Sequence, residues 1–309
     1  MPYYATVPDS MRERLAELAA LLHRCRDTYL RIDEDHHWMV HPSSAAASDL
    51  AVFAGTVGVR DDRLVVEAVA TYLELAAAHC GGLAGLYDAG EIVASPWPLA
   101  RSLLESCARA IWILGSDPSA EPAVNRLARA YIDNDLSAEY EKEISEYLQG
   151  RQWPAYLAAK ERFTRLRAEI STVFPETTGR DFNKRTIHGQ VCLGPTDTVL
   201  WFFALLAKSA HRPLDPRAPK AVYDLLSTHT HPTLDPVGRR RLFAEWDDGG
   251  RRAQTIRLDG IEWLTSLAAM GIYDALSSVY QYCGWEFDID SEFETMIDRT
   301  LPGFLWPSP

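Results

Sequence analysis

The chain has 309 residues, of which 47% are hydrophobic, so it can bury a large core in one domain or in two closely packed ones. Its formal net charge of -12 repels phosphate backbones and weakens any general role in nucleic-acid binding. The five cysteines are scattered and form no Cys-x-x-Cys pair, which indicates neither a disulfide framework nor a zinc ribbon and predicts reduced, mostly buried thiols.

The first residues contain no basic segment that leads into an apolar stretch, which predicts a chain without a secretion signal. The longest strongly apolar run, 199–207, is about half of the roughly 20 residues that cross a bilayer. We therefore expect a soluble, cytoplasmic protein with no membrane attachment.

Apolar residues recur every three or four positions through most of the chain, which predicts an all-α fold built as a multi-helix bundle. Helix limits follow from N-capping residues such as Asp9 and from glycines such as Gly90 and Gly115. The first helix should end in an acidic loop rich in histidine. In chain order, the expected helices cover residues 9–30, 61–87, 96–114, 121–148, 153–173, 196–209, a segment after the prolines at 213–219 that ends near Thr228, 259–282 and 291–299.

Five segments carry more specific expectations. Residues 121–148 and 153–173 have many charges on their exposed faces and predict a long solvated hairpin of two helices. The glycines within 175–195 predict a long loop, and the apolar helix 196–209 should be the most buried element. Near 241–258 the pattern favours a short β-hairpin as the competing prediction.

The chain shows neither an internal repeat nor a low-complexity linker. We therefore expect a single all-helical domain over 1–309. A subdivision into N-terminal helices, 1–175, and C-terminal helices, 176–309, is the open alternative.

Two histidines one residue apart, His229 and His231, follow the helix that carries Tyr223 and Ser227. Pro232 biases His231 away from the α conformation and so ends this helix. Positions i and i+2 of an extended segment point the same way, so both imidazoles could address one proton, one anion or one metal ion. The alternative is a helix C-terminus at which histidines interact favourably with the helix dipole.

A second histidine cluster lies in the acidic segment 33–41, where His37 and His41 are four residues apart. If the fold brings them beside the first pair, they could form a divalent metal site with Asp33 or Glu34. The other interpretation is a solvated loop at a helix end.

Arg101, Glu105 and Arg109 share one stripe of the helix that follows Pro98, and Trp112 lies within that stripe. An exposed ion ladder explains the pattern equally well and adds only a few tenths of a kcal/mol per pair. If the stripe is buried, it could bind a carboxylate or a phosphate.

Asp133, Ser137 and Glu141 have the helical spacing of the second metal motif of class I terpene synthases. The aspartate-rich partner motif is absent, because the acid that follows Asp61 and Asp62 comes one residue too late. A terpene synthase-like enzyme is thus a remote alternative, and a solvated acidic face is the default.

Several residues between positions 96 and 231 can be taken together as one combination. They are Pro98, Arg101, Glu105, Arg109, Arg126, Arg129, Tyr223, Ser227 and a trailing histidine. This combination resembles a bacterial helical family of unknown function that is HEPN-like and related to AbiV phage-defence proteins. The resemblance implies an all-α fold and a common site for Arg101, Glu105, Tyr223, Ser227 and a histidine. Many HEPN domains are ribonucleases with an Arg-x(4 to 6)-His motif, for which this chain offers only Arg31 with His36 or His37, a match that chance supplies.

Three hypotheses follow. In the first, a pocket binds a small polar or anionic ligand. A histidine serves as general base or metal ligand, arginines bind the anion, and Glu105 orients the arginine beside it. The residues of this pocket are Arg101, Glu105, Arg109, Tyr223, Ser227, His229 and His231. In the second, the protein is a non-catalytic interaction or defence component whose charged helices and tail, 301–306, contact a partner, and a homodimer is one such assembly. The third is a HEPN-type ribonuclease.

Overall fold

The computed structural model describes residues 9–92, 94–209, 215, 217–228, 230, 258–286 and 291–302. Helices dominate them, and the prediction of an all-α multi-helix bundle is confirmed. The elements are α1 (Asp9–His36), α2 (Ala45–Ala54), α3 (Leu64–Ala89), α4 (Pro96–Leu114), α5 (Ala123–Gln149), α6 (Pro154–Val173), α7 (Gly179–Asn183), β1 (Thr186–Ile187), β2 (Gln190–Val191), α8 (Pro195–Ser209), α9 (Arg217–Thr228), α11 (Leu258–Cys283) and α12 (Ser291–Thr300).

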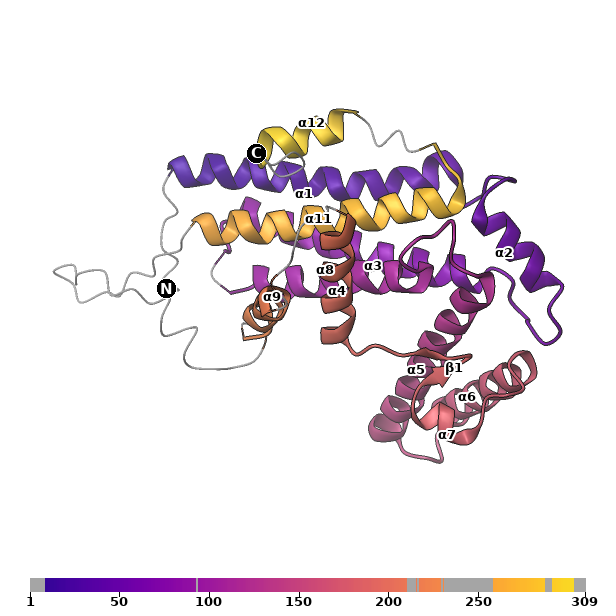
Figure 1. Cartoon of the computed structure of the whole chain (residues 1–309). Coiled ribbons are helices and arrows are strands. Elements are labelled where there is room, and N and C mark those ends of the chain that lie inside the picture. The colour runs from indigo at the N-terminus through magenta and orange to yellow at the C-terminus, as the bar shows by residue number, and fades with distance from the viewer. Residues whose placement is uncertain are drawn as a thin grey trace.

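Four long helices, α1, α3, α4 and α11, pack against one another and form the body of the bundle (Figure 1). The shorter elements are arranged around this body: α12 packs on α1, α2 packs on α11, and both α8 and α9 pack on α4. One hydrophobic cluster extends from Leu15 to Leu301 and draws on residues from both sides of position 175. The central helices thus bury the periodic apolar positions that predict them.

The first helix is longer than its sequence suggests, because α1 continues six residues past Leu30 to His36. Ile32 is fully buried, and the His36 ring stacks on Trp285 with 4.5 Å between ring centroids. Tertiary packing therefore extends the helix into a segment whose charges and histidines suggest a loop.

The expectation that residues 196–209 form the most buried element is wrong. In α8 only Thr198, Val199 and Phe202 are buried, whereas 14 of the 19 residues of α4 are buried. The reason is position: α4 lies among α3, α8, α9 and α11, whereas within the described chain α8 packs mainly on α4 and α9. Hydrophobicity of a segment does not tell how many neighbours it has.

Residues 175–195 are more ordered than the predicted long loop, since they contain α7 and the hairpin β1–β2. His188 and Gly189 connect the strands with φ values of 48° and 73°, the pattern of a tight two-residue hairpin turn. The β-hairpin predicted near 241–258 falls almost entirely on residues outside those described.

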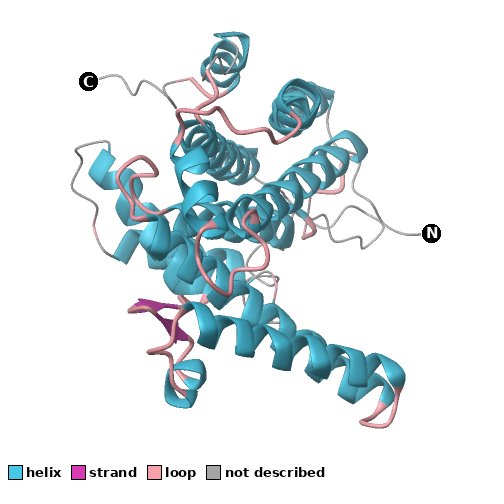
Figure 2. Cartoon of the chain, turned by 90° about the vertical axis from the view of Figure 1, so that its right-hand side faces the viewer, coloured by secondary structure: helices cyan, strands magenta, loops and turns pink. Residues whose placement is uncertain are grey.

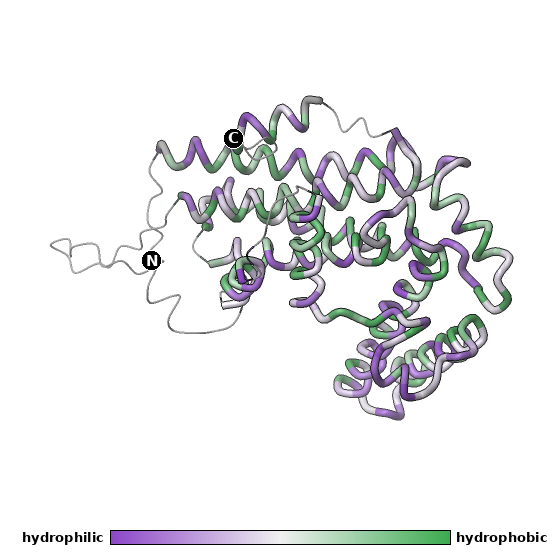
Figure 3. Tube along the Cα trace, in the orientation of Figure 1, coloured by the Kyte–Doolittle hydropathy of each residue, from purple (hydrophilic) through white to green (hydrophobic). Residues whose placement is uncertain are grey.

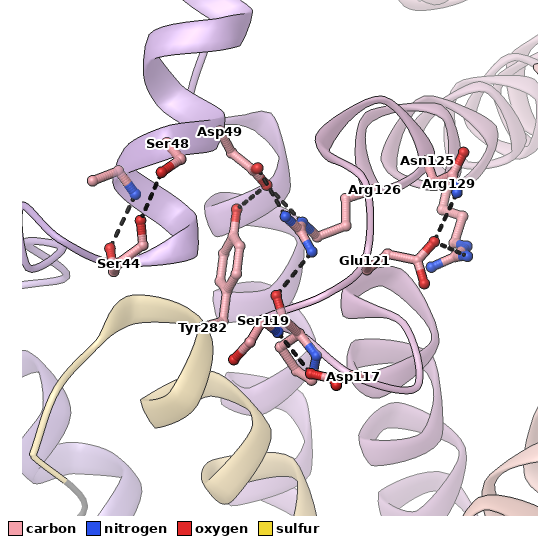
Figure 4. Close-up of polar contacts among 12 residues, drawn as sticks. Ser44, Ser48, Asp49, Asp117, Ser119, Glu121, Asn125, Arg126, Arg129 and Tyr282 are labelled. Carbon is pink, nitrogen blue, oxygen red and sulfur yellow. Dashed lines mark hydrogen bonds and ion pairs between the residues drawn. The ribbon is translucent and has the colours of Figure 1, made fainter.

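The segment between α1 and α3 contains α2, which the helical periodicity does not predict. Ser44 caps it, because its hydroxyl accepts a hydrogen bond from the Ala47 N–H. The buried Asp49 of α2 pairs with Arg126 of α5 and accepts a hydrogen bond from Tyr282 of α11 (Figure 4). This polar network fixes α2 against two helices distant in sequence.

The helices α5 and α6 form the predicted hairpin, which extends away from the bundle (Figure 2). Its first part is anchored, since Arg126, Tyr131, Asp133 and Asp135 are buried. Beyond Asp135 no residue of α5 is buried. Polar and apolar residues alternate along both helices (Figure 3).

One helix, α3, is long and apolar enough by length and composition alone to cross a membrane. It lies inside the bundle, where Val69, Leu73, Cys80 and Leu83 are buried against neighbouring helices. Core helices of soluble proteins pass the same test.

Candidate functional site

The α4 stripe, defined as Arg101, Glu105, Arg109 and Trp112, lies partly buried beneath other elements. The arginine and glutamate side chains at its start keep 19% and 27% exposure, whereas Arg109 and Trp112 are buried. An exposed ion ladder therefore does not describe the stripe. It is the partly buried arrangement in which the sequence predicts anion binding.

Arg101, Glu105 and Tyr223 form a closed hydrogen-bonded triad between α4 and α9. The Arg101 Nε–H donates to Glu105 Oε1 at 2.7 Å, and its Nη2 donates to the Tyr223 hydroxyl at 2.8 Å. The Tyr223 hydroxyl donates in turn to Glu105 Oε1 at 2.7 Å. The Arg101 guanidinium also lies 5.0 Å from the centre of the Tyr223 ring. The three residues, which the resemblance to the HEPN-like family links across 122 positions, thus meet in one place.

Burial and charge set the protonation states of the triad. Burial raises the pKa of Tyr223, and its hydrogen bond to Glu105 adds to this effect. Burial alone lowers the pKa of Arg101, but its hydrogen bond and charge attraction to Glu105 raise that pKa overall. At neutral pH Arg101 is therefore a guanidinium ion and Tyr223 a neutral phenol.

Arg109 occupies the other end of the stripe, two turns beyond Arg101. Its Nη2 donates to the Leu193 carbonyl at 2.8 Å, its Nε lies 3.6 Å from Asp133 Oδ1, and its guanidinium lies over the Trp112 ring at 4.9 Å. The Tyr72 hydroxyl donates a hydrogen bond to the other carboxylate oxygen of Asp133. Burial raises the pKa of Asp133, and the nearby Arg109 partly opposes that rise.

Of the four buried side-chain atoms that have no hydrogen-bond partner among the described residues, two belong to the helices that carry the triad. They are Arg109 Nη1 on α4 and the Ser227 hydroxyl on α9, one turn beyond Tyr223. An unpaired buried donor costs about 1–3 kcal/mol, so such groups usually meet a water or a ligand.

His229 and His231 lie outside the described residues. The helix α9 ends at Thr228, the residue before His229, as the sequence predicts. His41 Nδ1 lies 2.9 Å from Ser43 Oγ, and His37 is exposed at the end of α1. That end of α1 lies beside α2 and away from α9 (Figure 1). In the described part of the chain, no three His, Cys, Asp or Glu side chains gather closely enough to hold a metal ion.

The arginine–histidine pair of the ribonuclease hypothesis lies at the same end of α1. The ring of His36 stacks on Trp285 and meets Tyr280 edge-on at 5.8 Å between centroids. These contacts give the imidazole a packing role.

Asp133, Ser137 and Glu141 have separate partners. The Ser137 hydroxyl donates to the Asp133 carbonyl at 3.0 Å, and Glu141 pairs with Arg162 of α6. A solvated acidic face is wrong for Asp133, which is buried against Tyr72 and Arg109. The spacing of the three residues places them on one helix but does not tell which of them faces the core.

Two open hollows, of about 370 and 410 Å³, lie along the α5–α6 hairpin. Neither is lined by residues of the α4 stripe. The case for ligand binding at the stripe therefore depends on its charges and unpaired donors.

Sequence reasoning missed three contributors to this region. Tyr72 and Asp133 come from α3 and α5, and the Leu193 carbonyl precedes α8. A backbone carbonyl such as that of Leu193 cannot be recognised from the sequence. A polar residue in an apolar helix, such as Tyr72 in α3, does indicate a buried polar contact.

A scan against models of protein families finds no match, and searches of curated proteins and of solved structures find none either.

Proposed function

We propose that the protein binds a small polar or anionic molecule beside the α4 stripe, in contact with Arg101, Arg109 and Ser227. The observation that carries the proposal is that two buried donors lack a partner in the described chain, Arg109 Nη1 on the helix of Arg101 and Ser227 Oγ on the helix of Tyr223. A carboxylate or a phosphate group accepts hydrogen bonds from both kinds of donor.

The triad supplies the rigidity that such a site needs. Glu105 and Tyr223 hold the Arg101 guanidinium by two hydrogen bonds, so its free N–H groups have a fixed direction before a ligand arrives. In this proposal Glu105 orients Arg101, and the arginines bind the anionic end of the ligand.

His229 and His231 follow α9 directly in the sequence, so they are assigned the reactive role, as general base or as ligands of a divalent metal. The resemblance to HEPN-like proteins joins the same set of residues. It is also the one support for a role in phage defence.

The test is ligand-dependent thermal stability, because a molecule that binds only the folded state raises the unfolding temperature. The probes are inorganic phosphate, acetate and small dicarboxylates. At saturating concentration we expect one of them to raise the midpoint in the wild type, and the rise should disappear in Arg101→Ala and Ser227→Ala.

The matched control is Arg180→Ala, which removes an exposed arginine of α7 and should leave the rise unchanged. His229→Ala with His231→Ala should retain anion binding and lose turnover of any substrate found. The proposal is wrong if no anion in the panel shifts the wild type, or if Arg101→Ala and Arg180→Ala behave alike.

A further inference from the structure

Apolar side chains gather on the surface of the α5–α6 hairpin. Six of the 13 large hydrophobic residues that are exposed in the described chain fall between positions 140 and 157. They are Tyr140, Ile144, Tyr147, Leu148, Trp153 and Leu157, with exposures from 50% to 84%. Contiguous apolar surface of this kind marks an interaction site in a soluble protein.

The four members on α5 form one stripe, since positions 140, 144, 147 and 148 lie on one face of a helix. Lys142 lies on the opposite face, where its Nζ is 4.0 Å from the centre of the Phe163 ring of α6. The apolar stripe of α5 therefore points away from α6. Because α5 leaves the bundle, no described element covers the stripe.

An acidic row borders this stripe. Glu139, Glu143 and Glu146 are spaced by four and three residues and so lie side by side along one flank. Glu146 pairs with Arg151, and Glu139 lies 3.7 Å from Arg185 and 4.0 Å from Arg167, whereas Glu143 has neither an ion pair nor a side-chain hydrogen bond within the described chain. A partner that covers the stripe thus meets Glu143 at its edge, the one member of the row without an ion pair in the described chain.

We infer that the α5 stripe binds an amphipathic helix of another protein, whose apolar face is bordered by lysine or arginine. Its apolar side chains would lie on Tyr140, Ile144 and Tyr147, and its basic residues would meet the acidic row. In the complex α5 lies between α6 and the bound helix. This inference is independent of the ligand site at the α4 stripe.

A second copy of this chain fits the surface less well. Two antiparallel α5 helices related by a two-fold axis that lies in the interface and runs across both helices would place the acidic row of each opposite the same row of the other. Like charges at that position oppose association. Charge complementarity therefore favours a basic partner.

The test uses a fluorescent synthetic helix of three heptads, with leucine at the core positions and lysine beside them. A second probe has glutamate in place of lysine. We expect the wild-type full chain to bind the basic probe in fluorescence anisotropy and the acidic probe at least about tenfold more weakly. Added salt should weaken the binding of the basic probe.

Tyr147→Ser with Leu148→Ser should abolish binding, because it removes two apolar side chains of the stripe. Both side chains are more than three-quarters exposed, so their loss should leave the fold unchanged. Glu143→Lys should weaken the basic probe and strengthen the acidic one without removing apolar surface. The matched control is Leu75→Ser, which removes a leucine of 45% exposure from α3 and should change nothing.

The inference is overturned if the wild type binds neither probe, or if Leu75→Ser weakens binding as much as the hairpin variant does. It is also overturned if light scattering shows a wild-type dimer that Tyr147→Ser with Leu148→Ser separates. In that case a second copy occupies the stripe.

Discussion

Arg126 of α5 makes a two-pronged ion pair with Asp49 of α2, with its Nε and Nη2 at 2.6 and 2.8 Å from the two carboxylate oxygens. Both side chains are almost fully buried, and the Tyr282 hydroxyl donates a third hydrogen bond to Asp49 at 3.0 Å (Figure 4). The ion pair and Tyr282 together join α2, α5 and α11. Because the pair is buried, each of its two charges is compensated mainly by the other.

Removal of one partner should therefore destabilise the protein strongly. Arg126→Ala leaves the Asp49 carboxylate buried without its counter-charge, and we expect the free energy of unfolding in urea to fall by about 3–5 kcal/mol. Arg162→Ala, which breaks an ion pair with Glu141 whose side chains are about half exposed, should cost less than about 1 kcal/mol. If the free energy of unfolding falls equally in the two variants, burial of the Arg126–Asp49 pair does not increase its contribution to stability.

Ser227→Ala should leave the ligand-free protein as stable as the wild type, or more stable by up to about 1 kcal/mol. The substitution removes a buried hydroxyl that has no partner in the described structure. Thr198→Val is the matched control, because that buried hydroxyl donates to the Gly194 carbonyl at 2.9 Å and its loss should cost about 1 kcal/mol. Urea unfolding measures both, and a clear loss in Ser227→Ala would reveal a partner for Ser227.

Replacement of two glycines by alanine should change the stability of the protein in opposite directions. Gly284 has φ +69°, and an added Cβ would lie 2.7 Å from Ser44 Cβ, so Gly284→Ala should destabilise the protein by about 1–3 kcal/mol. Gly85 is an exposed helical residue of α3 with free space around it, so Gly85→Ala should stabilise the protein by about 0.5–1 kcal/mol. Thermal unfolding of the two variants checks the order, and the reverse order would contradict the backbone described at residue 284.

Asp274 of α11 should make stability depend on pH. Burial raises its pKa to about 7 in the folded protein, whereas in the unfolded chain the value is about 3.9. The folded state thus holds the proton more tightly, so this stabilisation is complete below about pH 4 and is lost as the pH rises through about 7.

Asp274→Asn should therefore match the wild type near pH 4 and exceed its free energy of unfolding by about 1–3 kcal/mol at pH 8. Urea unfolding at several pH values measures the difference. Asp62→Asn, which changes an exposed carboxyl group, should follow the wild type throughout. A difference for Asp274→Asn that does not change with pH would show that burial does not raise this pKa.

Elements with strong local signals could be predicted closely from the sequence. The helix α4 has the expected limits because prolines open it and Gly115 closes it, and α9 ends at Thr228 as Pro232 indicates. The meeting of Arg101, Glu105 and Tyr223 is indicated only by the resemblance to the HEPN-like helical family, because the spacing of residues does not tell which two helices touch.

Features that depend on tertiary neighbours could not be predicted. Helical spacing places Asp133 and Glu141 on one helix, yet only the packing of α3 and α4 decides that Asp133 is buried. The same holds for the burial of α8, which depends on the number of its neighbours. Local signals for α2 and for the β1–β2 turn exist at Ser44 and Gly189, but they are weak beside the dominant helical pattern.

The position of α11 in the fold has a consequence for synthesis of the chain. This helix lies against α1, α3 and α4, yet the ribosome makes it last among the long helices. A nascent chain that ends before Leu258 exposes the apolar faces of α1, α3 and α4 that α11 later covers. These helices can therefore form only a partly packed intermediate until α11 is added. The core is therefore completed only after α11 has been synthesised, and a chain shortened before α11 is a natural client for chaperones and proteases.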